Sequence, residues 1–282
     1  MSQVDLSVII INHNTRELSQ NAVASLYEHT KGLNWEIILV DNSTEERERF
    51  CPLIENPVKL IQVENRGFSH GCNMGFNMSS GRHLLFLNSD TLISNNLLPD
   101  CVKYLDEHQA IGVLGVKTFL ANGLLDHSCK RGFPTLRNAF YYFAGFDRRH
   151  PENPKYCGYH LLHLDPEVIH SVDAISGAFM MTPRKVFEEL GGFDQDFFMY
   201  GEDLDYCFRT KETGRQVIYY PRFSILHLKG RSGFALKKGE TARQFYRSMK
   251  LFYRKHYRQK YGMATNLLAY AAITALYIWK RI

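Results

Sequence analysis

The sequence lacks the motifs of several large protein classes. No Gly-x-Gly-x-x-Gly follows the first predicted strand and no Gly-x-x-x-x-Gly-Lys-Ser/Thr occurs anywhere, which argues against a dinucleotide-dependent dehydrogenase and a P-loop enzyme. The six cysteines include no Cys-x-x-Cys pair, so we expect reduced thiols in a cytoplasmic protein, and neither a disulfide framework nor a zinc site. The first apolar run, LSVIII, is too short for the h-region of a signal peptide.

Internal repeats, low-complexity tracts and long linkers are also missing, whereas hydrophobic residues make up 45% of the 282 residues. This composition predicts one fused globular unit with a sizeable core. Charge is distributed unevenly, because residues 237–282 contain eleven Lys or Arg and a single acid, Glu240. Of the chain's 34 basic and 29 acidic residues, 23 and 28 therefore lie in residues 1–236, which carry a net charge of −5. A mildly acidic body bears a strongly basic tail.

Four apolar runs in the first 95 residues each end in a polar cluster: LSVIIINHN, WEIILVDNS, VKLIQVEN and HLLFLNSD. Continuous apolar, β-branched runs indicate strands buried on both faces, and a helical pattern over about residues 16–30 follows the first run. Strands that alternate with helices predict a parallel sheet, whose ligands bind beyond the carboxyl ends of the strands. The residues expected to converge on that rim are His13, Asn14, Asp41, Asn42, Asn88 and Asp90.

The second half of the chain has a looser pattern. We expect a short strand before a helix over residues 184–190, and then a second helix over about residues 201–213. A strand pair is predicted over RQVIYYPRFSILHLKG, with His227 near its end. Since no linker separates these elements from the first half, both halves should belong to one fold.

Taken together, these segments resemble the inverting family 2 glycosyltransferases of the GT-A fold, and in particular the rhamnosyltransferase-like branch that builds bacterial surface polysaccharide. Seven segments in the family's order carry the resemblance and cover most of residues 6–233: SVIIINHN, ILVDNS, ENRGFSHGCNMG, LFLNSD, SGAFMM, GGFDQDFFMYGEDLDYCFR and HLKGRS. The resemblance implies a three-layer α/β/α sandwich around a mostly parallel, mixed sheet, of the nucleotide-diphospho-sugar transferase type. It divides the chain into a nucleotide-sugar-binding half (1–95), an acceptor-binding and catalytic half of the same unit (96–236), and a basic amphipathic helical tail (237–282).

The implied activity is metal-dependent transfer of a sugar, with rhamnose as first choice, from a dTDP- or UDP-sugar to a hydroxyl of a saccharide or lipid-linked saccharide, with inversion. The acceptor hydroxyl must lose a proton as it attacks, and a carboxylate within hydrogen-bond reach can take it. Asp203 in the Gly-Glu-Asp sequence resembles the family's general base, and Glu202 lies beside it in the substrate site. Acids in a first helical turn can instead offset the helix dipole, which accounts for Glu202 and Asp205 but not for the preceding aromatic run FFMY.

Two residues resemble the family's ligands for a divalent cation, Mg²⁺ or Mn²⁺, which neutralises the departing diphosphate. Asp90 closes LNSD, where Asn88 takes the first place of the more usual Asp-x-Asp, and His227 opens HLKGRS. The alternatives are a turn formed by Asn-Ser-Asp and a structural histidine at a strand end.

The donor needs further contacts. Asp41 resembles the carboxylate that contacts the base or ribose, although Asp-Asn-Ser is also typical of an Asx turn at a helix start. The glycines of NRGFSHGCNMG would let backbone approach the donor closely, and HLKGRS would meet the diphosphate from a closing loop or remain a solvated basic loop. The other donor-binding residues implied by the resemblance are His13, Asn14, Arg66, Asn73, Asn88 and Arg231.

The C-terminal tail alternates cations with Phe and Tyr at helical spacing and then continues into about sixteen mostly apolar residues, fewer than the roughly 20 that span a bilayer. Basic amphipathic helices with aromatic residues bind anionic membrane interfaces. We therefore expect a protein peripheral to the inner face of the cell membrane. The alternatives are a tail packed on the body and a tail that forms a homodimer.

Two other functional classes remain open from the residues alone. A sugar nucleotidyltransferase shares the layered α/β plan, but it would place a Gly-rich loop with a basic residue after the first strand, where this chain has NHNTREL. A non-catalytic nucleotide- or nucleic-acid-binding module would use the basic tail, yet it leaves Asp90, Asp203 and His227 without a role. We therefore expect a nucleotide sugar, and not nucleic acid, as the partner.

Overall fold

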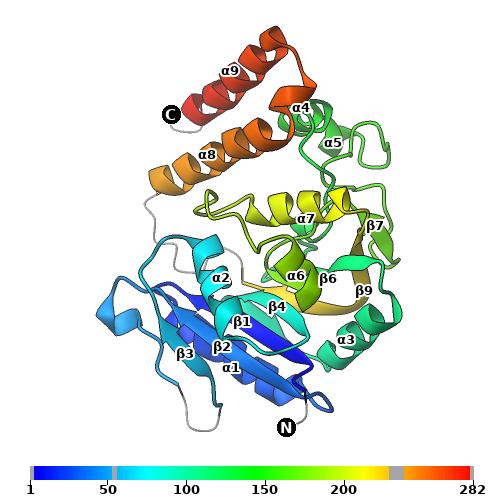
Figure 1. The fold of residues 1–282 in the computed structure, drawn as a ribbon. Helices are drawn as coiled ribbons and strands as arrows, with labels where there is room; N and C mark the ends of the chain where they lie inside the picture. Colours follow the sequence, from blue (N-terminus) through cyan, green and yellow to red (C-terminus); the bar gives the residue numbers. More distant parts are fainter. Residues whose placement is uncertain (1–2, 53–55, 229–237, 280–282) are drawn as a thin grey trace.

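A nine-stranded mixed sheet runs through the computed structural model, which describes residues 3–52, 56–228 and 238–279 (Figure 1). Within these residues the strand order is β3-β2-β1-β4-β8-β6-β9-β5, and β7 also pairs with β9. The strands are β1 Leu6–Asn12, β2 Trp35–Asp41, β3 Lys59–Gln62, β4 His83–Asn88, β5 Thr91–Ile93, β6 Ile111–Leu120, β7 His170–Val172, β8 Phe179–Pro183 and β9 Gln216–His227. The mixed α/β sheet expected from the sequence is confirmed.

The first four strands of the sheet order are parallel and align their polar ends. β1 lies between β2 and β4, and β2 pairs with β3. The register places Asn12 opposite Asp41 and Ile11 opposite Asn88, so these polar clusters share one edge of the sheet. β8 runs antiparallel to β4 and pairs Phe179 with Leu87, which brings the preceding residues, 174–178, to the same edge.

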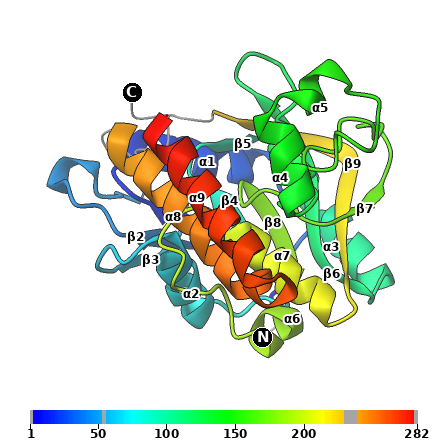
Figure 2. The ribbon, with the colours of Figure 1, turned by 90° about the horizontal axis from the view of Figure 1, so that it is seen from above.

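Helices cover both faces of the sheet and complete the expected three layers (Figures 1 and 2). Val8 and Ile10 of β1 pack in one cluster with α1 and α3, whereas Ile9 and Ile11 pack in a second cluster with α2, α6 and α7. Burial on both faces explains why the β1 sequence is continuously apolar and not alternating. The helices are α1 Arg16–His29, α2 Phe68–Met78, α3 Leu98–Glu107, α4 Leu136–Phe143, α5 Phe146–Arg149, α6 Arg184–Glu189, α7 Glu202–Glu212, α8 Lys238–His256 and α9 Met263–Trp279, with short 3-10 turns at Glu46–Glu48, His127–Cys129 and Arg258–Lys260.

The predicted strand pair over residues 215–230 is wrong, because its described part is the single strand β9. β9 pairs in parallel with β6, and the register shifts so that residues 221–223 stand opposite no residue of β6. Pro221 has no N–H to donate to the ladder, and a bulge accommodates it without reversing the chain. β9 therefore continues to the edge of the sheet, where His227 lies opposite Thr91 of β5.

The basic tail packs on the body through α8, which was the alternative to a membrane-surface helix. The Phe252 ring of α8 lies 5.9 Å from the Phe208 ring of α7, and Ser248 Oγ donates a 2.9 Å hydrogen bond to the Met199 carbonyl. Helix α9 runs beside α8, on the far side from the sheet (Figures 1 and 2). Among the described residues, no helix has the length and apolar character needed to cross a bilayer.

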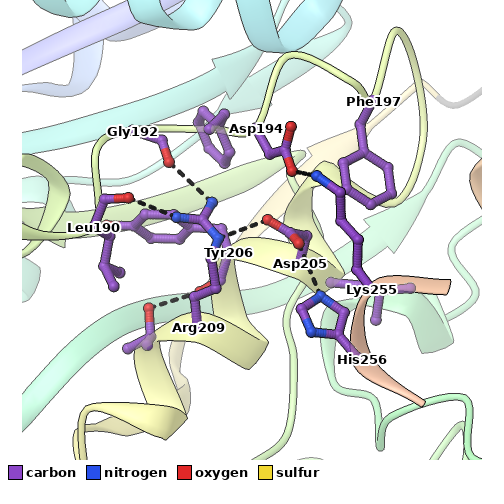
Figure 3. Close-up of polar contacts among 12 residues, drawn as sticks. Leu190, Gly192, Asp194, Phe197, Asp205, Tyr206, Arg209, Lys255 and His256 are labelled. Carbon is purple, nitrogen blue, oxygen red and sulfur yellow. Dashed lines mark hydrogen bonds and ion pairs between the residues drawn. The ribbon is translucent and has the colours of Figure 1, made fainter. Parts of the chain in front are cut away.

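A buried carboxylate joins α8 to α7 (Figure 3). Asp205, which is 1% exposed, accepts hydrogen bonds from Arg209 Nε at 2.7 Å and His256 Nε2 at 2.8 Å. Arg209 also donates hydrogen bonds to the carbonyls of Leu190 and Gly192. Lys255, the residue before His256, forms an ion pair with Asp194. Asp205 is thus more than a charge that offsets the helix dipole, because it fixes the position of α8.

Asp205→Ala should destabilise the protein by about 3–5 kcal/mol, since it leaves the Arg209 guanidinium and the His256 imidazole without the buried carboxylate that they share. Urea unfolding of the wild type and the variant measures this difference. Glu212→Ala, at the exposed C-terminal end of the same helix, is the matched control and should change stability by less than about 0.5 kcal/mol. Equal stability of the two variants would contradict the anchoring role of Asp205.

Candidate active site

Asn12, at the end of β1, organises one side of the sheet edge and is fully buried. Its Nδ2 lies within hydrogen-bond distance of Asp41 Oδ1 (3.1 Å), Ser43 Oγ (2.8 Å) and the Glu48 carbonyl (2.9 Å). Its Oδ1 accepts from the hydroxyls of Thr15 and Ser19. Sequence reasoning singled out the two residues after Asn12 and missed Asn12 itself. The available signal was an amide side chain at the last position of a buried apolar strand.

Asp41 holds the loop that follows β2. Its Oδ1 accepts from Asn12 and, at 3.0 Å, from Ser43 N, while its Oδ2 accepts from Phe50 N at 2.8 Å. The contact with Ser43 N is the Asx turn expected from Asp-Asn-Ser. Because both oxygens have protein donors and the residue is 3% exposed, Asp41 shapes the wall of this edge, and its contact with a base or ribose stays a prediction.

His13 and Asn14 tie the loop after β1 to the loop after β2. His13 Nδ1 lies 3.0 Å from the Asn42 carbonyl. Asn14 has a left-handed φ of +54°, which Asn tolerates better than most residues, and its Oδ1 accepts from the N–H groups of Thr44 and Glu45. Both residues are half-buried, so the structure places them together at the predicted rim.

The predicted donor loop at residues 65–75 is used largely for packing. Arg66 is exposed and pairs with Glu64 at 2.8 Å, and the Asn73 amide bonds to both backbone groups of Phe193. A Cβ on Gly67, whose φ is +102°, would lie 2.4 Å from the Phe198 carbonyl oxygen. Gly67 therefore admits the chain's own backbone, while the approach of this loop to the donor stays a prediction.

Asp90 and His227, the two predicted metal ligands, are adjacent. His227 Nε2 lies 3.1 Å from Asp90 Oδ1, and both side chains are buried. On the other side of the imidazole, Nδ1 lies 3.5 Å from Oδ2 of Asp126, a residue that sequence reasoning missed. Burial alone would lower the pKa of His227, but its contacts with Asp126 and Asp90 raise this pKa to about 9. Without a metal, we therefore expect a protonated imidazole between the two carboxylates at neutral pH.

This pair fits one side of a divalent cation site. Two ligands at right angles on an octahedral Mg²⁺ are roughly 3 Å apart, close to the spacing of Asp90 Oδ1 and His227 Nε2. The Asp126 carboxylate behind Nδ1 would direct Nε2 toward the metal, as carboxylates do behind many metal-bound histidines. No group of three or more His, Cys, Asp or Glu in the described part of the chain is arranged to hold a metal by itself, so donor oxygens or water would complete the shell.

Asp203, the predicted general base, lies in the first turn of α7 with its carboxylate oriented by three donors. Oδ2 accepts from Arg131 Nη2 at 2.5 Å and from Gly177 N at 3.2 Å, and Oδ1 accepts from Leu204 N at 2.8 Å. A carboxylate offers about four lone-pair sites, so about one remains for a substrate hydroxyl. The side chain is 13% exposed. Arg131 is a third residue of the site that sequence reasoning missed. Burial would lower the pKa of its guanidinium, but the Asp203 carboxylate raises that pKa well above the usual value.

The Asp90 and Asp203 parts of the site meet on one backbone segment. Gly177 N donates to Asp203, while the carbonyl of the next residue, Ala178, accepts from Asn88 N at 3.2 Å and from Thr91 Oγ1 at 3.3 Å. Asn88 is half-buried at the end of β4. Asp203 and two sequence neighbours of Asp90, Asn88 and Thr91, are thus bonded to two consecutive residues of one segment, while a shared site for Asp90 and Asp203 stays a prediction.

Glu202 is buried beside the predicted base, and its Oε2 has no hydrogen-bond partner in the described part of the chain. Burial and the neighbouring Asp203 carboxylate raise the pKa of Glu202 to about 8. The expected aromatic rim is only partly a rim, because Phe197 and Met199 are buried in the core and only Tyr200 is exposed. Arg231, predicted to meet the diphosphate, lies outside the described residues.

Similarity to known proteins covers most of the chain. The profile of a family described as "Glycosyltransferase like family 2" matches residues 5–262. Rhamnosyltransferase WbbL of Escherichia coli (strain K12) is 28% identical over 172 residues, which cover 57% of this chain and 60% of WbbL. The low-salt glycan biosynthesis hexosyltransferase Agl10 of Haloferax volcanii is 27% identical over 214 residues, or 73% of this chain and 62% of Agl10. The chain thus matches less than two thirds of the length of either relative.

A solved structure shows the same fold. The crystal structure of GalNAc-T7 with UDP, GalNAc and Mn²⁺ superposes with a TM-score of 0.61 at 15% identity, over 89% of this chain and 48% of that chain. At this identity the likeness concerns the arrangement of strands and helices.

Stability should fall as pH rises from about 4.5 to about 8, in part through Glu202. Over that range the folded protein retains the Glu202 proton that the unfolded chain has lost, because the pKa is higher in the folded state. Glu202→Gln keeps a neutral side chain at every pH, so its melting temperature should fall less between about pH 5 and pH 8 than that of the wild type. Thermal melts across this range test the prediction, with Glu212→Gln on the same helix as control. Parallel curves for wild type and Glu202→Gln would contradict it.

Proposed function

The chain belongs to glycosyltransferase-like family 2, and from this premise we propose that it transfers a sugar, rhamnose by preference, from a nucleoside-diphosphate sugar to a hydroxyl of a saccharide or lipid-linked saccharide, with inversion. The observation that carries the proposal is the common contact of the two parts of the site with Gly177 and Ala178. We infer from this contact that a carboxylate able to accept a proton and a pair of cation ligands lie at one edge of the sheet. Attack by an alcohol needs a proton acceptor, and a bound cation can offset the charge of the leaving diphosphate.

Asp203 is proposed to take the proton of the acceptor hydroxyl as that oxygen attacks the anomeric carbon. Arg131 and Gly177 N–H hold Oδ2, which leaves Oδ1 as the atom that meets the hydroxyl. The bond from the anomeric carbon to the diphosphate breaks as the new bond forms on the opposite face. The configuration therefore inverts, and the nucleoside diphosphate leaves.

Asp90 and His227 are proposed to hold Mg²⁺ or Mn²⁺ together with diphosphate oxygens of the donor. When bound there, the cation offsets the negative charge that develops on the leaving group. Asp126 keeps Nδ1 of His227 engaged, so that Nε2 is the nitrogen directed to the cation. The Mn²⁺ and UDP in the GalNAc-T7 structure support this choice of cofactor and donor class.

The nucleoside of a dTDP- or UDP-sugar is proposed to lie against the loops after β1 and β2, where Asn12 and Asp41 fix the backbone and His13 and Asn14 remain partly accessible. The rhamnosyltransferase activity named for WbbL supports rhamnose as the sugar. We extend the proposal to surface polysaccharide synthesis in the cytoplasm, with the protein peripheral to the inner face of the membrane, where a lipid-linked acceptor would be found.

Asp203→Asn should reduce transfer by about 10²–10⁴-fold, because the amide cannot accept the acceptor's proton. Donor affinity should change little, since the residue does not contact the nucleoside diphosphate in this proposal. Acceptor-dependent release of nucleoside diphosphate measures transfer, and calorimetric titration measures donor binding. Asp165→Asn, an exposed residue outside the site, is the matched control. Wild-type turnover in Asp203→Asn would reject this residue as the base.

A donor screen tests the activity itself. Among UDP-, dTDP- and GDP-sugars supplied with Mg²⁺ or Mn²⁺, we expect one dTDP- or UDP-sugar to give acceptor-dependent nucleoside diphosphate release.

Removal of divalent cations with EDTA should abolish this release. Asp90→Asn should lower the affinity of the protein for the cation, and quenching of protein fluorescence by Mn²⁺ measures that affinity. Turnover that persists in EDTA would overturn the metal assignment, and release from none of the donors would overturn the activity.

A further inference from the structure

A groove of about 1120 Å³ lies between α8 and α9, and none of the predicted site residues lines it. Its α8 side carries cations spaced three or four residues apart, so that they follow one face of the helix and continue just beyond its end. These groove cations are Arg243, Arg247, Lys250, Arg254 and Arg258. None of them forms an ion pair with a residue that the structure describes, and the one acid in the lining, Asp196, lies near Lys255 instead.

The other side of the groove belongs to α9, which has no charged residue between Met263 and Trp279. Only Ala269 and Ile273 of this helix are buried, against α8. Most of its other residues are apolar and exposed, among them Leu267 at 65%, Leu268 at 72% and Trp279 at 75%. A row of uncompensated cations therefore runs beside an uncovered apolar helix, which is unusual for a surface that faces only water.

We propose that this α8–α9 surface docks on an anionic lipid bilayer, with the groove cations at the headgroups and the outer face of α9 in the interface. Charge complementarity favours a bilayer over a second copy of this chain, since a two-fold dimer through the same surface would oppose two rows of cations. The exposed leucines and Trp279 supply the apolar area, and a tryptophan is typical of the membrane–water interface. This inference rests on the proposed peripheral location but not on the transfer chemistry.

The same surface is connected to the loop that carries the proposed base. Ser248 of α8 bonds to the Met199 carbonyl at 2.9 Å, and the Phe245 ring lies 6.0 Å from the Tyr200 ring. Arg243 and Arg247 flank Phe245 on the same helix. Docking of α8 and α9 would thus hold the 199–203 segment close to the bilayer surface, within reach of an acceptor attached to lipid.

Vesicle flotation of the full chain tests the proposal. We expect binding to vesicles of phosphatidylcholine with roughly one-third phosphatidylglycerol, weak binding to phosphatidylcholine alone, and weaker binding at about 0.5 M than at about 0.1 M salt. Arg247→Gln with Arg254→Gln should weaken partitioning by about fivefold for each charge removed. Leu268→Ser should also weaken it. The matched controls are Lys103→Gln on α3 and Leu124→Ser after β6, both exposed and distant in sequence from the groove.

Three results would overturn the inference. They are equal binding to neutral and anionic vesicles, wild-type partitioning of both the arginine double variant and Leu268→Ser, and a dimer in light scattering that Leu268→Ser converts to monomer without a change in vesicle binding. Release of nucleoside diphosphate with a water-soluble acceptor serves as an independent readout. If it is unchanged in the groove variants while vesicle binding is lost, the surface assignment holds. If no donor is used but vesicles are bound with the expected charge dependence, only the transfer proposal fails.

Discussion

The site depends on one stretch of backbone, residues 174–178, whose polar groups are bonded to both halves of the chain. Ala174 exchanges backbone hydrogen bonds with Arg131, and the Ile175 carbonyl accepts from the Arg131 guanidinium at 2.7 Å. Gly177 N binds Asp203, and the Ala178 carbonyl binds Asn88 N. Buried backbone groups must find partners, and here those partners are the residues of the site or their immediate neighbours. The segment leads directly into β8, which lies between β4 and β6, so the sheet fixes where the bonds to Asp203 and Asn88 are made.

The three carboxylates of Gly-Glu-Asp-Leu-Asp show how strongly environment separates like residues. Glu202 is buried with no cation of the described residues within ion-pair distance, and burial together with the Asp203 carboxylate raises its pKa to about 8. Asp203, one residue on, is paired with Arg131 and retains a lone pair for a hydroxyl. Asp205 is buried between Arg209 and His256 and joins two helices. The first turn of α7 therefore holds a carboxyl of raised pKa, an oriented carboxylate and a structural ion pair, and only the middle one has the accessibility that proton transfer needs.

The two faces of helix α8 in the tail have different surroundings. On α8, Phe252 packs against α7, whereas Tyr246 and Tyr253 pack against α9, so α8 belongs to the core of the protein. Its cationic face remains open and faces α9, which adds apolar surface without adding charge. The resulting surface combines features that the two helices do not have separately, and the contact of α8 with the 199–201 loop relates it to the proposed catalytic residue.

The sequence alone determined the layered α/β fold, because continuous apolar runs with polar ends are diagnostic of strands covered on both sides, and β1, β2 and β4 indeed end together. It also indicated that Asp90 and His227 belong together through the motifs that contain them, and the structure brings them to 3.1 Å. Only the tertiary structure showed what Gly67 and Asn73 contact and that a single strand runs across Pro221. It also showed the parts played by Asn12, Asp126 and Arg131. Each of these depends on a contact between residues remote in the chain, such as Arg131 with Asp203. A local pattern of residue types carries no information about which distant donor reaches a given carboxylate, since burial and partner are properties of the packed molecule.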